Sequence, residues 1–128
     1  MQRFYSLGFT LAFLIALPYF LFQVLCHRKY CSSFIERLGI LPNQIRLRPS
    51  GGIWIHAVSA GEVLSALPLI KKVRQRWPNR PVFLSTTSSS GQLLARQNCT
   101  DLDDIFYFPL DWKFSVRQTL KQVRPSLV

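Results

Sequence analysis

Short apolar runs alternate with amphipathic stretches along most of this chain. The runs predict strands at residues 52–57, 81–86 and 104–108, and the start of a fourth strand at 125–128. Apolar residues spaced by three and four predict helices at residues 59–77, 92–97 and 112–123. Strand and helix alternate three times with short connections, which favours an α/β fold with a parallel, Rossmann-like sheet, flanking helices and right-handed crossovers.

The predicted helices carry apolar positions on one side. In helix 59–77 these form one stripe that we expect to be buried: Val63, Ala66, Leu67, Ile70, Val73 and Trp77. In helix 112–123 they are Phe114, Val116, Leu120 and Val123. A short helix at residues 31–38, stopped by Gly39, precedes a predicted loop at 42–52.

Residues 4–26 are rich in Leu, Phe, Ala and Ile and contain no charged side chain. A helix needs about 20 apolar residues to cross a bilayer, so this segment is long enough to be a membrane anchor. We favour a retained anchor over a cleaved signal peptide, whose apolar region is usually about 7–15 residues long. The predicted organisation is an anchor at 1–28, a short helix and basic loop at 29–51, and a Rossmann-like domain at 52–128.

Basic residues follow the anchor and give the chain a net charge of +10. One arginine precedes the apolar segment, whereas Arg28, Lys29, Arg37, Arg46 and Arg48 come soon after it. The positive-inside rule therefore predicts that the domain lies on the cytoplasmic side of the membrane. The basic surface is either solubilising or attracts anionic lipid, and no nucleic-acid-binding signature is present. The three cysteines lack zinc-site or disulfide spacing, and we predict no metal site.

The segment from Gly52 to Glu62 is the strongest candidate for chemistry, because a strand runs into a helix through a turn of small residues. Ser59 and Glu62 fit the capping box S-x-x-E, which is the simpler interpretation. The alternative is that Glu62 is a general base at the carboxyl edge of the sheet, where open α/β sheets place their active sites. Gly61 would let backbone or substrate approach closely. His56 is more typical of a core histidine whose hydrogen bonds are satisfied.

A second polar turn, Thr86–Gly91, follows the second predicted strand and belongs to the same edge. We expect Ser90 to cap the next helix. The functional alternative is a turn rich in hydroxyl and amide groups that binds phosphate or sugar hydroxyls. Asp111 follows the third strand, and we expect it to cap the third helix. No P-loop or G-x-G-x-x-G pattern is present.

Four features occur in order along the chain: the apolar N-terminus, Glu36-Arg37-Leu38-Gly39, the block from Gly52 to Glu62 and the turn Thr86–Gly91. Together they resemble the N-terminal half of 3-deoxy-D-manno-octulosonic acid (Kdo) transferases of lipopolysaccharide synthesis. Leu110-Asp111 and the segment 124–128 match as well. The resemblance implies a GT-B architecture with two Rossmann-like domains across a cleft. It also implies inverting transfer from CMP-Kdo to the lipid A precursor at the inner membrane, with no cofactor.

The family's catalytic base falls on Glu62. The residues expected to contact the acceptor are Ser59, Gly61, Ser88, Ser90, Gly91 and Arg37. The donor, CMP-Kdo, would be bound by a C-terminal domain that this sequence does not include, so we expect the chain to be a fragment that is inactive alone. Two alternatives are a non-catalytic, membrane-bound module that binds anionic lipid and half of a glycosyltransferase that uses another sugar.

Overall fold

The computed structural model describes residues 14–19, 21–22 and 28–128. Residues 14–19 and 21–22 are helical. The chain divides into two units, Met1–Phe34 and Ile35–Val128, and the second contains the whole sheet. In chain order the elements are α2 (Arg28–Arg37), α3 (Asn43–Arg46), β1 (Gly52–Ala57), α4 (Ala60–Arg76), β2 (Val82–Thr86), α5 (Ser89–Asn98), β3 (Asp104–Tyr107), α6 (Lys113–Val123) and β4 (Pro125–Leu127).

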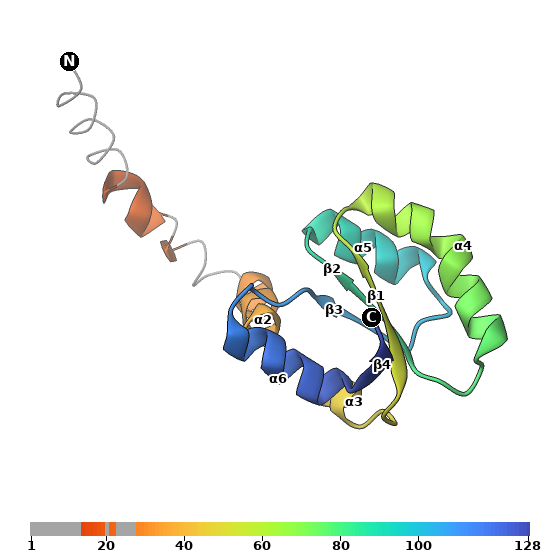
Figure 1. The fold of residues 1–128 in the computed structure, drawn as a ribbon. Coiled ribbons are helices and arrows are strands. Elements are labelled where there is room, and N and C mark those ends of the chain that lie inside the picture. Colours follow the sequence, from red (N-terminus) through yellow and green to blue (C-terminus); the bar gives the residue numbers. More distant parts are fainter. Residues whose placement is uncertain (1–13, 20, 23–27) are drawn as a thin grey trace, which may run out of the picture. The chain divides into compact units, whose positions relative to one another are not determined.

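The predicted parallel α/β sheet is confirmed. Its four strands lie in the order β3-β2-β1-β4, and every pair is parallel. Helices α4 and α5 cover one face, and α3 and α6 cover the other (Figure 1). Because all strands run the same way, the turns that follow β1, β2 and β3 meet at one carboxyl edge.

Two apolar layers fill the space between the sheet and its helices. The layer under α4 and α5 includes Val63, Ile70, Leu84 and Ala95. The opposite layer, against α3 and α6, is built on Leu41, Ile45, Trp54, Phe83, Phe106 and Val123. Ile45 is fully buried, which explains why a four-residue helix forms within the segment that the sequence predicted to be a loop.

The predicted stripe of α4 is correct except at its end. Val63, Ile70 and Val73 are buried, but Trp77 is 39% exposed. The helix ends at Arg76, and Trp77 takes the non-helical C-cap conformation, so its ring leaves the line of the stripe. The ring lies instead beside the Arg76 guanidinium, whose Cζ is 6.0 Å from the ring centroid.

The predicted apolar side of α6 is only partly the buried side. Phe114 and Leu120 are exposed, whereas Ser115, Thr119 and Val123 are buried. Small side chains face inward because the backbone at Gly39 lies against this helix. A Cβ added to Gly39 would lie 2.6 Å from the Ser115 carbonyl oxygen, so no larger layer fits between them.

Two cap assignments from the sequence are wrong. The N-cap of α5 is Ser88, whose Oγ accepts a hydrogen bond from the Gly91 amide at 3.0 Å, and Ser90 lies inside the first turn. The N-cap position of α6 is Trp112, without a side-chain cap, so Asp111 does not cap that helix. At α5 two serines suited the cap position and the packed backbone selected Ser88, whereas at α6 the helix begins one residue later than a cap at Asp111 would require.

The predicted anchor at 1–28 lies mostly outside the described residues. Within the ranges that the structure describes, no helix has the length and apolar character needed to cross a bilayer.

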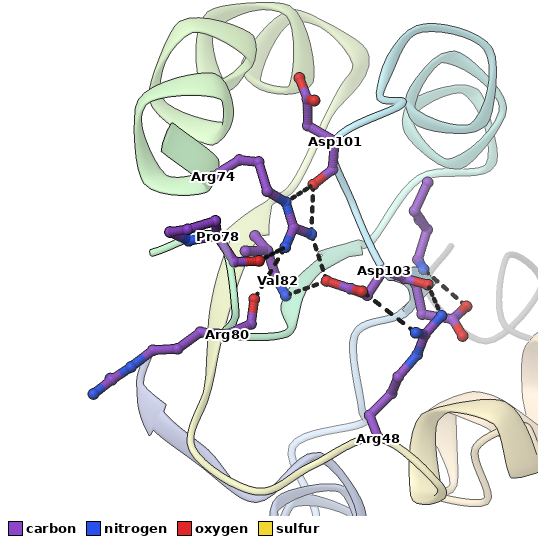
Figure 2. A network of polar contacts seen from close by, with 9 residues as sticks. Arg48, Arg74, Pro78, Arg80, Val82, Asp101 and Asp103 are labelled. Atoms are coloured by element: carbon purple, nitrogen blue, oxygen red, sulfur yellow. Dashed lines mark hydrogen bonds and ion pairs between the residues drawn. The ribbon is translucent and has the colours of Figure 1, made fainter. Parts of the chain in front are cut away.

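At the opposite edge of the sheet, Arg74 joins the loops that precede β2 and β3 (Figure 2). Its guanidinium donates hydrogen bonds to three carbonyl oxygens, those of Pro78, Arg80 and Asp101. It also forms an ion pair with Asp103, with 2.5 Å between Nη2 and Oδ2. All five N–H groups of the side chain therefore have acceptors.

Asp103 is the acidic centre of this network. Besides Arg74, it accepts a hydrogen bond from the Val82 amide at 2.8 Å and pairs with Arg48 at 3.4 Å. Burial alone would raise the pKa of Asp103, but the Arg74 hydrogen bond, the Val82 amide and the two arginine charges outweigh it. The pKa of the carboxyl is therefore held below its ordinary value.

Replacing Arg74 with Lys is expected to lower the free energy of unfolding by about 2–3 kcal/mol, because one ammonium cannot serve the four acceptors. Asp103 has a lowered pKa in the folded state, so its contribution is present above its unfolded pKa of about 3.9 and is lost as the pH falls through the folded value. Urea denaturation at several pH values tests this. The difference in free energy of unfolding between wild type and Arg74→Lys should become smaller in acid. The exposed control Arg76→Lys should unfold with the same free energy as wild type. A difference in free energy of unfolding that stays constant down to low pH would contradict the stabilising role given to the Arg74–Asp103 ion pair.

Candidate functional site at the carboxyl edge of the sheet

Glu62 stands in the first turn of α4, directly after β1. Its backbone N–H donates to Ser59 Oγ at 3.5 Å, and its Oε2 accepts a hydrogen bond from the Val58 amide at 2.8 Å. The predicted capping interaction is therefore present, with the return bond to Val58 instead of Ser59. The side chain is exposed, and within the described residues Oε1 accepts no hydrogen bond. One carboxylate oxygen fixes the group while the other is available to take a proton.

Val58 connects this carboxylate to the turn after β2. Its carbonyl oxygen accepts hydrogen bonds from the amides of Thr87 and Ser88, at 3.2 and 3.1 Å. Gly91 then packs against the start of α4, where an added Cβ would lie 3.3 Å from the carbonyl carbon of Ser59. The fold thus brings together two turns that are separated by a whole helix in the sequence.

The serine-rich turn is internally hydrogen-bonded. Ser90 Oγ donates to Ser88 Oγ at 3.3 Å, and Ser88 Oγ accepts from the buried Gly91 amide. Gly61 differs, because a Cβ added there would meet no atom within 4 Å. Among the described residues no backbone makes a close approach to Gly61, so of the two expected approaches only that of a substrate stays a prediction.

Arg37, at the end of α2, also reaches this edge. Its Nη2 donates to the Thr87 carbonyl oxygen at 2.5 Å, and its Cζ lies 4.7 Å from the centroid of the Tyr107 ring. Its own carbonyl oxygen accepts from the Leu110 amide at 2.8 Å. The half-buried guanidinium is therefore fixed beside the Thr87–Ser88 turn, and it places a positive charge at this edge of the sheet.

The neighbouring Glu36 belongs to the segment that carries the family resemblance, but the sequence predicted no role for it. Its carboxylate accepts a hydrogen bond from the Tyr107 amide at 3.0 Å, which occupies a backbone donor of the edge strand β3. Burial raises the pKa of Glu36, and the Tyr107 amide and nearby arginine charges oppose this shift without cancelling it. No local pattern signals this role, because strand and carboxylate are 71 residues apart.

His56 is not the core histidine that the sequence indicated. It is exposed near the end of β1, although Nδ1 lies 2.9 Å from Ser85 Oγ and the ring packs against Phe108 in a tilted arrangement with 4.0 Å between centroids. The same Ser85 hydroxyl accepts a hydrogen bond from Trp54 Nε1 at 2.8 Å. Alternation along β1 places Trp54 and His56 on one face of the sheet, but their shared partner depends on the register with β2.

The edge therefore gathers a carboxylate, a hydroxyl-rich turn, an arginine and an imidazole. Asp111 is exposed in the segment after β3. Among the residues that the structure describes, no group of three His, Cys, Asp or Glu side chains is placed to hold a metal ion. The roles of Glu62 and of the residues expected to contact the acceptor remain predictions, although the fold places them at one edge.

Comparison with known proteins gives one family. The family described as 3-deoxy-D-manno-octulosonic-acid transferase (kdotransferase) matches residues 32–128. A 3-deoxy-D-manno-octulosonic acid transferase of Chlamydia pneumoniae is 30% identical over 98% of this chain and 29% of its own length. The enzyme of the same name from Haemophilus influenzae is 32% identical over 77% of this chain and 23% of its own length. The chain thus spans less than a third of these relatives, and no solved structure gives a significant match.

Proposed function

This chain belongs to the Kdo transferase family, and on that premise we propose that it supplies the acceptor-side domain for transfer of Kdo from CMP-Kdo to the lipid A precursor. The observation that carries the proposal is the position of Glu62. Its carboxylate accepts a hydrogen bond from the Val58 amide at the carboxyl edge of the sheet. The carbonyl oxygen of Val58 accepts from the hydroxyl-rich turn that begins at Thr87, and Arg37 donates to the Thr87 carbonyl oxygen. A sugar-phosphate acceptor needs these groups: a base for its hydroxyl, and donors for its anionic oxygens.

In the proposed reaction, Glu62 takes the proton from the attacking hydroxyl of the acceptor. The hydroxyl oxygen forms a bond to the anomeric carbon of Kdo while the bond from that carbon to the CMP phosphate oxygen breaks, and the electron pair leaves with CMP. Attack from the face opposite to the leaving group inverts the anomeric centre. The chain's own contribution is to orient the acceptor and to hold Oε1 of Glu62 ready, and a second domain would bind the donor.

We also propose that the domain works at the cytoplasmic face of the inner membrane. The outer side of α6 supports this location, because Lys113, Arg117 and Lys121 surround the exposed Phe114 at a shallow hollow of about 420 Å³. Cations beside an aromatic ring suit the interface of a membrane that contains anionic lipid. The basic residues predicted to follow an anchor would add to this attraction.

One assay tests both proposals. The complete transferase containing this chain is incubated with CMP-Kdo and lipid A precursor in anionic or zwitterionic vesicles. Mass spectrometry should show acceptor that has gained Kdo, and sedimentation should recover more enzyme with the anionic vesicles. A CMP-linked sugar acid of different carbon number is the donor control. Transfer from the control donor and not from CMP-Kdo would overturn the proposal that CMP-Kdo is the donor. Lipid binding without any transfer would favour the non-catalytic alternative.

A further inference from the structure

The imidazole of His56 is fixed on two sides and unoccupied on a third. Its ring lies against Phe108, with an angle of 32° between the planes, and Nδ1 contacts both the hydroxyl and the carbonyl oxygen of Ser85, at 2.9 and 3.2 Å. Within the described part of the chain, Nε2 makes no hydrogen bond. The exposed ring therefore has a fixed orientation and one unused nitrogen.

The buried partner of His56 decides which nitrogen carries the proton. Ser85 is fully buried, and its hydroxyl accepts from Trp54 Nε1 while lying next to His56 Nδ1. A hydroxyl has one hydrogen to donate, and a buried donor left without an acceptor is unfavourable. The two contacts of Nδ1 favour opposite tautomers: the Ser85 carbonyl oxygen at 3.2 Å could accept only from a protonated Nδ1, whereas the closer hydroxyl at 2.9 Å can donate to an unprotonated one. We take the second arrangement, because it gives the buried hydroxyl hydrogen an acceptor. The neutral ring then carries its proton on Nε2 and acts as a hydrogen-bond donor toward solvent.

His56 is close in the chain to the residues that hold the proposed base. His56 is two residues before Val58, whose amide holds the Glu62 carboxylate, and strands rise about 3.3 Å per residue. Phe108, on which the imidazole rests, donates its own amide to the Thr86 carbonyl oxygen just before the serine-rich turn. The imidazole therefore belongs to the same edge as Glu62 and Arg37, at the end of an aromatic cluster with Trp54.

We propose that His56 binds the acceptor by donating a hydrogen bond from Nε2 to an anionic phosphate oxygen, and that Trp54 and Ser85 set the tautomer that makes this possible. The inference rests on the proposed function and adds to it a binding residue distinct from the base. Glu62 and His56 then have separate tasks: Glu62 accepts the proton of the reacting hydroxyl, and His56 donates a hydrogen bond to the phosphate.

Steady-state kinetics of the complete enzyme test the binding role. His56→Phe keeps a ring against Phe108 but has no N–H, and we expect the acceptor KM to rise about 10- to 100-fold with kcat unchanged within about threefold. His56→Gln carries an amide N–H near the position of Nε2 and should restore most of the affinity. An acceptor without phosphate groups should bind wild type and His56→Phe equally weakly.

Four kinetic results would overturn the proposal. An unchanged KM in a folded His56→Phe enzyme would mean that His56 does not contact the acceptor. A fall in kcat without a change in KM would assign His56 to the chemical step. If His56→Gln were as impaired as His56→Phe, the donor at Nε2 would not be the group that matters. An equal loss for His56→Phe with the phosphate-free acceptor would move the contact to another oxygen of the acceptor.

Nitrogen NMR of enzyme labelled with ¹⁵N-histidine tests the tautomer without any turnover. The His56 signals are assigned by their loss in His56→Phe. We expect a protonated Nε2 and an unprotonated Nδ1 in the neutral ring, with Nε2 shifting when lipid A precursor vesicles are added. The opposite tautomer, or no shift with bound vesicles, would overturn the inference. If the enzyme transfers no Kdo yet this shift occurs, the proposed reaction fails while the binding site stands.

Discussion

Glu62→Gln in the complete transferase is expected to lower kcat for Kdo transfer by about 10²- to 10⁴-fold, the usual contribution of a general base. Gln keeps a side-chain oxygen that can accept from the Val58 amide, so the interaction seen at 2.8 Å is retained. What it loses is the carboxylate oxygen Oε1 that would take the proton. We therefore expect a change in stability of less than about 1 kcal/mol, below the typical cost of losing a cap. Product formation measured alongside urea denaturation separates the two effects.

The matched control is Asp111→Asn, which also removes one negative charge from an exposed side chain, in the segment after β3. Since Asp111 does not cap α6, this variant should keep both its stability and its transfer rate. A folded Glu62→Gln enzyme that turns over within about tenfold of wild type would rule out Glu62 as the base. Equal losses in the two variants would point to the overall charge of the edge.

Gly39→Ala is expected to lower the free energy of unfolding by about 2–5 kcal/mol. Gly39 has φ +91°, where an L residue loses about 1–2 kcal/mol. The added methyl would also lie 2.6 Å from the Ser115 carbonyl oxygen and 2.8 Å from Gln118 Cβ. The first contact is with helix backbone, which cannot move aside like the end of a flexible side chain, so the overpacking adds about 1–3 kcal/mol.

Gly51→Ala is a close control, because Gly51 has nearly the same backbone conformation, φ +87°, and an added Cβ would meet nothing within 4 Å. It should lose only the conformational part, about 1–2 kcal/mol. The difference in unfolding free energy between the two variants, measured by urea denaturation, isolates the close approach to α6. Equal losses would mean that the turn does not press on that helix. Because Gly39 lies only two residues after Arg37, this contact also helps to position the arginine at the functional edge.

Local sequence patterns were sufficient to predict an element when the residues of that element alone determined its structure. The apolar run that ends in a turn of small residues predicted β1 at its observed bounds, 52–57, and Ser59 as the cap of α4. Alternating strands and helices predicted the parallel sheet, and parallel strands bring their following turns to one edge. The meeting of the Val58–Ser59 turn with the Thr87–Gly91 turn follows from that topology, so the main candidate site was accessible from sequence.

Local sequence patterns failed where several residues were equally suited to one structural position. Ser88 and Ser90 both suit an N-cap, and only the packed backbone put Ser88 there. In α6 the apolar residues would face inward by periodicity, yet Phe114 is 53% exposed because the Gly39 turn admits only small side chains. Hydrophobicity favours burial of a large side chain, but close packing decides whether there is room for it.

The sequence by itself determined the class of fold, the family and the carboxylate at the end of the first strand, because each depends on residues close together in the chain. The tertiary structure decided which distant groups share that edge. Arg37 reaches the Thr87 carbonyl oxygen across 50 residues, and the Ser85 hydroxyl joins Trp54 to His56 through strand register. Such contacts depend on how whole elements pack, since register and close approach are set by the summed burial of many side chains and leave no local signal.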